Sequence, residues 1–125
     1  MILVVDDEGA VRELVRLALE QAGYEVTQAS NAEEAWQILE RSQPELLLTD
    51  IVMPGENGLQ LAARAHRLNP RIHAIFMSGF AEQYRDELSG SICLSKPFTI
   101  AALLAAVEGA IGHPRKIVPD GRGSG

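Results

Sequence analysis

The sequence has little cysteine, few aromatic residues and fewer basic than acidic side chains. Its single cysteine, Cys93, excludes an internal disulfide framework and fits a reducing compartment. Eleven lysines and arginines against 17 aspartates and glutamates give a net charge of −6. A nucleic-acid partner for this domain is therefore not expected, because such partners usually need a basic face.

Long apolar runs are also absent. No stretch approaches the roughly 18 apolar residues of a membrane-spanning helix, and the start of the chain lacks the basic and small-residue regions of a signal peptide. These absences predict a cytoplasmic protein that has no membrane partner.

What the sequence does contain is an alternation of two periodicities. Short apolar runs predict strands at 2–5, 24–29, 45–50, 72–78 and 91–95. Helical spacing predicts helices over 9–22, 32–39, 59–68 and 99–111, with N-caps at Asn31 and Thr99. A weaker helix carries Phe80, Tyr84 and Leu88 at i, i+4 and i+8. Five strands alternating with five helices predict an α/β domain, a doubly wound parallel sheet with helices on both faces.

The end of the chain has a different composition. Residues 112–125 mix proline, glycine and scattered charges without apolar periodicity. We expect the folded domain to occupy residues 1–111 and residues 112–125 to form a flexible C-terminal tail or linker.

Polar side chains stand at the carboxyl end of four predicted strands. Asp6 and Asp7 follow the first strand, Asp50 ends the third, Ser78 ends the fourth and Lys96 follows the fifth. Ligands of an open parallel α/β sheet bind beyond the carboxyl ends of its strands. We therefore expect these five side chains to meet at one edge of the sheet.

The chemistry of such a cluster is specific. Carboxylates brought close together raise one another's pKa unless a cation neutralises them. Mg²⁺ suits carboxylate oxygens and commonly shares its ligands with a phosphate, while lysine and serine supply a positive charge and a hydroxyl donor. A carboxylate can also be the nucleophile of phosphoryl transfer and form an aspartyl phosphate. Asp50, alone on the central strand, is the expected nucleophile, with Asp6 and Asp7 left to hold the metal.

Four motifs match a known family in order and spacing. The stretches LVVDDE, LLLTDIVMPGENG, FMSG and CLSKPF resemble those of response-regulator receiver domains of two-component signalling, over residues 2–111. The resemblance implies a flavodoxin-like sheet of strand order 2-1-3-4-5. It further implies a phosphorylation-activated switch in a phosphorelay, whose partner is a sensor histidine kinase or a histidine phosphotransfer protein. A stand-alone receiver and a receiver joined to a hybrid sensor kinase both fit the sequence.

The resemblance also assigns a phosphoacceptor and a metal site. Asp50 would take the phosphoryl group from a phosphohistidine. Asp7 and Asp50 would bind Mg²⁺ directly, Asp6 would act partly through water, and the backbone carbonyl of Val52 would be a further ligand. Pro54 would shape the loop that presents Asp50.

The remaining motif residues are assigned to the phosphate. Ser78 would turn inward to meet the phosphoryl group and Lys96 would pair with it, so that both couple phosphorylation to a conformational change. Gly79 would leave room for the phosphate to enter. The Lys96–Pro97 bond resembles the family's cis peptide.

One departure from the family concerns Cys93. Many receivers carry tyrosine or phenylalanine at this position, three residues before Lys96, and the ring moves inward on phosphorylation. A serine–aromatic switch in its usual form is therefore not expected. Phe80 and Tyr84 are candidates for a moving ring, although their spacing favours core packing.

Two apolar positions predict the lifetime of the phosphate. Val52 and Phe80 lie two residues beyond Asp50 and Ser78, where they would flank the approach of a hydrolytic water that neither can orient. We expect slow autodephosphorylation, and no conventional enzyme activity beyond this reaction and self-catalysed phosphorylation.

Two other functions remain open. A phosphate-independent binding module with the receiver fold is compatible with Cys93, but the complete set of acidic, serine and lysine residues argues against it. A phosphatase with an aspartyl intermediate usually carries a second acid two residues after the nucleophile, where this chain has Val52.

Overall fold

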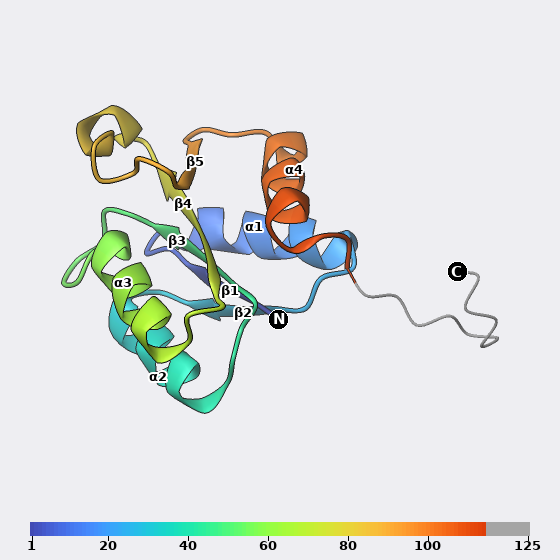
Figure 1. Cartoon of the computed structure of the whole chain (residues 1–125). Helices are drawn as coiled ribbons and strands as arrows, with labels where there is room; N and C mark the ends of the chain where they lie inside the picture. The colour runs from blue at the N-terminus through green and yellow to red at the C-terminus, as the bar shows by residue number, and fades with distance from the viewer. Residues whose placement is uncertain (115–125) are drawn as a thin grey trace, which may run out of the picture.

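The computed structural model describes residues 1–114 as a five-stranded parallel sheet covered by helices (Figure 1). The strands are β1 (Ile2–Val5), β2 (Val26–Ala29), β3 (Leu46–Asp50), β4 (His73–Ser78) and β5 (Ile92–Ser95). The helices are α1 (Gly9–Gln21), α2 (Ala32–Arg41), α3 (Gly58–Leu68) and α4 (Ile100–Ile111), with a 3₁₀ helix η1 (Ala81–Tyr84). Every pair of neighbouring strands is parallel and their order is β2-β1-β3-β4-β5, which confirms the predicted doubly wound fold.

The sheet separates two apolar cores. Side chains of successive strand residues point to opposite faces, so Leu3 and Val5 pack towards α2 and α3 while Ile2 and Val4 pack towards α1 and α4. In Figure 1, α2 and α3 lie on one side of the sheet and α1 and α4 on the other. All residues of β1 and β3 are buried, which explains why these central strands read as continuous apolar runs.

Side-chain caps begin three of the four α-helices. Asn31 accepts a hydrogen bond from the backbone of Glu34, and Thr99 accepts one from the backbone of Ala102, as the sequence predicts. Helix α3 begins with a capping box in which Asn57 and Gln60 each accept from the other's backbone N–H. These caps fix where each helix starts relative to the strand end before it.

The predicted helix after β4 is wrong in type and extent. Only the 3₁₀ helix η1 forms there. Of the three residues expected on the buried face of that helix, Leu88 is buried, Tyr84 is half-buried and Phe80 is 53% exposed. A short helix without a continuous buried face is marginal in water, so the segment folds instead as successive turns that end at Gly90, whose φ is +81°.

The structure describes only the beginning of the predicted tail, residues 112–114. The Tyr24 hydroxyl donates a hydrogen bond of 2.8 Å to the carbonyl of Gly112. The rest of the predicted tail, from residue 115, lies outside the described residues. Within residues 1–114, none of the helices has the length and apolar character needed to cross a bilayer.

Candidate functional site

The acidic residues at the ends of β1 and β3 meet as predicted. Asp6, Asp7 and Asp50 each place a carboxylate oxygen within 4.8 Å of the others. They do so because β1 and β3 are paired neighbours at the centre of the sheet. Asp6 is fully buried and Asp50 is 6% exposed, whereas Asp7 is exposed. The cluster therefore opens to solvent on the Asp7 side.

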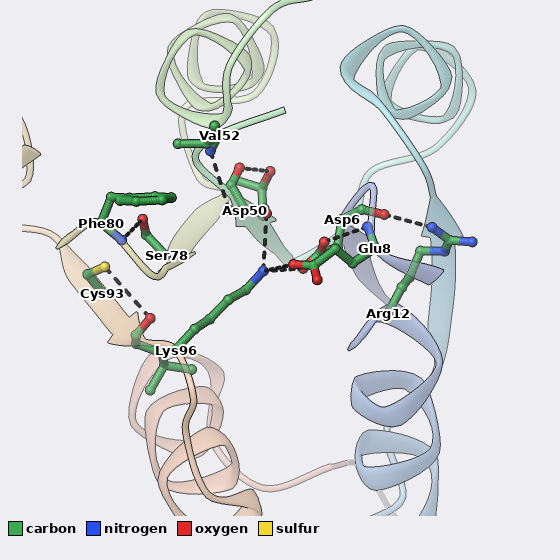
Figure 2. Close-up of polar contacts among 11 residues, drawn as sticks. Asp6, Glu8, Arg12, Asp50, Val52, Ser78, Phe80, Cys93 and Lys96 are labelled. Carbon is green, nitrogen blue, oxygen red and sulfur yellow. Dashed lines mark hydrogen bonds and ion pairs between the residues drawn. The ribbon is translucent and has the colours of Figure 1, made fainter. Parts of the chain in front are cut away.

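Lys96 reaches into this cluster from beyond β5. Its Nζ lies 2.9 Å from Asp6 Oδ2, 3.1 Å from Asp50 Oδ2 and 3.3 Å from Glu8 Oε1. Figure 2 shows the side chain extended between Asp50 on one side and the pair Asp6 and Glu8 on the other. The Lys96–Pro97 peptide is cis, as the family resemblance implied. One ammonium group thus joins the two buried carboxylates.

Burial and pairing shift the pKa values of the two central groups. Burial is the largest influence on Asp50 and raises its pKa, while the hydrogen bond and charge of Lys96 oppose that rise. Burial alone would lower the pKa of Lys96, but its hydrogen bonds to Asp6 and Asp50 outweigh it, and the pKa is raised. Lys96 is therefore a permanent cation of the site at neutral pH.

The loop after β3 holds Asp50 from its other side. The backbone N–H of Val52 donates to Asp50 Oδ1 at 3.3 Å, and Val52 itself is 44% exposed. Gly58 lies so close that a Cβ there would stand 2.1 Å from the carbonyl oxygen of Asp50. Pro54 is exposed and lines a cleft with Asp7. The start of α3 is thus packed directly against the strand end that presents Asp50.

Ser78 and Gly79 lie at the neighbouring strand end. Ser78 is buried, and its Oγ accepts a hydrogen bond of 2.8 Å from the backbone N–H of Phe80 (Figure 2). A Cβ at Gly79 would meet no atom within 4 Å, so the space beside it is open. The serine hydroxyl is therefore bound to the β4–η1 turn, beside open space at Gly79.

The candidates for a moving ring differ in their surroundings. Cys93 is half-buried and packs against the core on the α2 and α3 side, and burial raises the pKa of its thiol. Tyr84 packs against the same core, whereas Phe80 is largely in solvent. The packing interpretation therefore fits Tyr84 but not Phe80.

Two residues at the site were missed or left unassigned by sequence reasoning. Arg12 donates from Nη1 to the backbone carbonyl of Asp6 at 2.7 Å, and no spacing in the sequence signals that contact. Glu8 could be read as a helix-start charge or as part of the site; it precedes α1 without a side-chain cap hydrogen bond, and its contacts belong to the site. Its backbone N–H donates to Asp6 Oδ1 at 2.9 Å, while its side chain reaches Lys96.

The donor set fits a hard divalent cation. Three carboxylates from two neighbouring strands offer oxygen atoms only, which is the ligand chemistry that Mg²⁺ and Ca²⁺ prefer. Asp6 already shares one oxygen with the Glu8 N–H and the other with Lys96, whereas Asp7 faces solvent. Asp50 is engaged in the same way, with one oxygen bound by the Val52 N–H and the other by Lys96, so Asp7 is the one acid of the three that faces solvent.

Comparison with known proteins decides which family has this arrangement. The family model of the response regulator receiver domain matches residues 2–108, nearly all of the described chain. The chain belongs to this family. Receiver domains of response regulators receive phosphoryl groups from histidine kinases. The resemblance carried by the four sequence motifs is confirmed.

Individual relatives differ in how much of their length this receiver domain covers. The response regulator receiver protein CpdR of Brucella abortus (strain 2308) is 38% identical over 111 residues, which are 86% of this chain and 92% of CpdR. The DNA-binding transcriptional regulator NtrC of Bradyrhizobium sp. (strain RP501 Parasponia) is 36% identical over 121 residues, 94% of this chain but 25% of NtrC. The chain therefore spans nearly all of one relative and about a quarter of the other.

A solved structure supports the same fold. The response regulator protein TrrA of Thermotoga maritima, solved in complex with Mg²⁺ and BeF, superposes with a TM-score of 0.80 at 33% identity, covering 88% of this receiver domain and 97% of TrrA.

Proposed function

We propose that this receiver domain is a Mg²⁺-dependent switch in which Asp50 accepts a phosphoryl group. The observation that carries the proposal is the junction of Asp50 with Asp6, Asp7 and Lys96 at one edge of the sheet. The donor is a phosphohistidine of a sensor histidine kinase or of a histidine phosphotransfer protein in the cytoplasm. The folded receiver ends near residue 111, where α4 ends.

Asp50 supplies the nucleophile. One of its carboxylate oxygens forms the new bond to phosphorus while the bond from phosphorus to the donor's imidazole nitrogen breaks, and the electron pair of that bond remains on the imidazole. Bound Mg²⁺ would offset the negative charge of the carboxylates and the phosphoryl oxygens. Asp7 and Asp50 would bind that ion directly, Asp6 would act partly through water, and the carbonyl of Val52 would be a further ligand. The Val52 N–H donates to Asp50 Oδ1 and so helps to hold the nucleophilic carboxylate in place.

Lys96 and Ser78 would convert phosphorylation into a conformational change. Lys96 is bound to Asp50 Oδ2 and is available to a phosphoryl group placed on that carboxylate. Ser78 Oγ now accepts from Phe80 N–H. If the hydroxyl turns to donate to the phosphoryl group beside Gly79, the β4–η1 turn loses that tether. Phosphorylation would then change the surface around η1, β5 and α4, which a downstream partner would recognise. This change would not involve the moving aromatic ring of many receivers, because this chain has Cys93 at that position.

The phosphoryl group is expected to be hydrolysed slowly. Val52 and Phe80 are 44% and 53% exposed, and both are apolar side chains near the mouth of the site. Neither offers a donor or acceptor that could orient an attacking water. Self-catalysed phosphorylation and slow dephosphorylation are the only reactions we assign to the domain.

The decisive experiment is phosphorylation of the purified chain by acetyl phosphate, followed by intact mass. We expect one phosphoryl group to be added, to require Mg²⁺, and to be lost in Asp50→Asn. Asp86→Asn is the matched control because it removes an exposed aspartate in the segment after η1 that is not one of the clustered acids. If the folded protein takes no phosphoryl group and does not respond to beryllofluoride, the phosphate-independent binding module replaces this proposal.

A further inference from the structure

Asp7 is the least restrained of the three clustered acids. Asp6 is held by the Glu8 N–H and by Lys96, and Asp50 is held by Lys96 and the Val52 N–H. Across residues 1–114, no hydrogen bond or ion pair reaches the Asp7 carboxylate, which is also exposed. The direction of the Asp7 side chain therefore depends on how firmly its backbone is held.

Arg12 holds that backbone. Its Nη1 donates at 2.7 Å to the carbonyl oxygen of Asp6, which belongs to the peptide that joins Asp6 to Asp7. Its Nε donates at 3.2 Å to the side-chain oxygen of Gln28 on β2. The guanidinium therefore links the Asp6–Asp7 peptide to the neighbouring strand, and in Figure 2 it lies on the side of Asp6 opposite Lys96.

The charge of Arg12 is not used in an ordinary surface ion pair. Arg16, one turn further along α1, pairs with Glu13 and Glu20, whereas within the described residues Arg12 makes no carboxylate salt bridge. Both of its hydrogen bonds instead go to neutral oxygens, one of them at the site. A planar guanidinium with several donors in fixed directions is suited to joining two such acceptors.

We propose that Arg12 is a positioning residue for the Mg²⁺ site: by clamping the Asp6–Asp7 peptide, it directs the Asp7 carboxylate at the metal. This inference rests on the proposed function, because it requires that Asp7 bind Mg²⁺. Groups that orient metal ligands typically contribute about 10- to 100-fold to metal affinity.

The loss of Arg12 changes the Mg²⁺ affinity in opposite directions, depending on whether the charge of Arg12 or its positioning role dominates. A positive charge beside an acidic cluster repels Mg²⁺, so an effect of charge alone predicts tighter binding in Arg12→Gln. If the clamp dominates, the same substitution releases the Asp6–Asp7 peptide and weakens binding. We expect weaker binding by about tenfold, at the lower end of the range for such groups because the contact is made through the backbone.

The test is calorimetric titration of Mg²⁺ into the full chain. Arg16→Gln is the matched control, since it removes the same charge from the same helix but from a residue paired with Glu13 and Glu20. A second variant, Gln28→Leu, keeps the Arg12 charge and removes the acceptor that anchors Nε. We expect Arg12→Gln to bind about tenfold more weakly and Gln28→Leu about threefold more weakly, with Arg16→Gln unchanged.

The outcomes separate this inference from the proposed function. Unchanged or tighter Mg²⁺ binding in Arg12→Gln overturns the positioning role, and so does unchanged binding in Gln28→Leu if Arg12→Gln fails to fold. If Arg12→Gln lowers the melting temperature but leaves the Mg²⁺ affinity of the folded protein unchanged, Arg12 only stabilises the fold and does not position Asp7. If the wild-type chain binds no Mg²⁺, the proposed metal site itself is wrong.

Discussion

Replacement of Lys96 by methionine tests how the buried charges are balanced. Two carboxylate oxygens lie 2.9 and 3.1 Å from its Nζ, and the Asp6 side chain has no exposure to water. At an effective dielectric constant of about 20, each contact corresponds to roughly 5 kcal/mol of Coulomb attraction, much of it offset by desolvation. Removing one partner of a buried pair costs about 3–5 kcal/mol because the other charge is left unpaired.

We expect Lys96→Met to lower the free energy of unfolding by about 3 kcal/mol in EDTA, at the lower end of that range because the lysine side chain keeps 15% exposure. Part of this loss should return in saturating Mg²⁺, since carboxylates released from Lys96 are free to bind the ion. The affinity for Mg²⁺ should tighten about tenfold, equivalent to roughly 1.4 kcal/mol.

Urea unfolding of the wild type and Lys96→Met, in EDTA and in Mg²⁺, measures both quantities. Arg67→Met is the control, because it removes one positive charge from an exposed position on α3 and should change stability by less than about 0.5 kcal/mol. A Lys96→Met protein as stable as this control in EDTA would refute the reasoning, as would equal stabilisation of both proteins by Mg²⁺.

Four further predictions concern Asp50, Gly58 in α3, Gly109 in α4 and the phosphoryl group. Since burial raises the pKa of Asp50, its charged form costs stability at every pH above that raised value and none below the ordinary aspartate pKa near 3.9. In the absence of Mg²⁺, Asp50→Asn should therefore be more stable than the wild type at pH 7 but not at pH 3, as measured by urea midpoints. Gly58→Ala places a Cβ 2.1 Å from the backbone oxygen of Asp50 and should lower the unfolding free energy by about 3 kcal/mol. Gly109→Ala, with no atom within 4 Å of its Cβ on the exposed side of α4, should instead raise it by about 0.5–1 kcal/mol in the same assay. Loss of the phosphoryl mass from the Mg²⁺-bound protein should take minutes or longer, and a half-life of seconds would contradict the role given to Val52 and Phe80.

The fold could be predicted because its signals are local. The apolar runs that become β1 and β3 are buried on both faces, and Asn31 and Thr99 cap helices where the sequence places them. The helix expected around Tyr84 failed because a periodic stripe shows only that a helix is possible, not that a surface exists to bury it. Phe80 at the start of that stripe is mostly in water.

The site could be predicted only in part. Asp6, Asp7, Asp50 and Lys96 follow apolar runs, and parallel strands bring such residues to one edge. Arg12 gives no such signal, because its function depends on a backbone oxygen and on a glutamine 16 residues away. Contacts of this kind depend on the angle at which a helix crosses its sheet, which no short motif encodes.

The reach of Lys96 has a consequence during synthesis of the chain. Its partners Asp6 and Asp50 precede it by 90 and 46 residues, so the charge-balanced site closes only after β5 has joined the sheet. A nascent or truncated chain that ends before residue 96 has the acids but not their cation. On the proposed function, the charge-balanced site that would receive the phosphoryl group is therefore assembled only together with the completed fold.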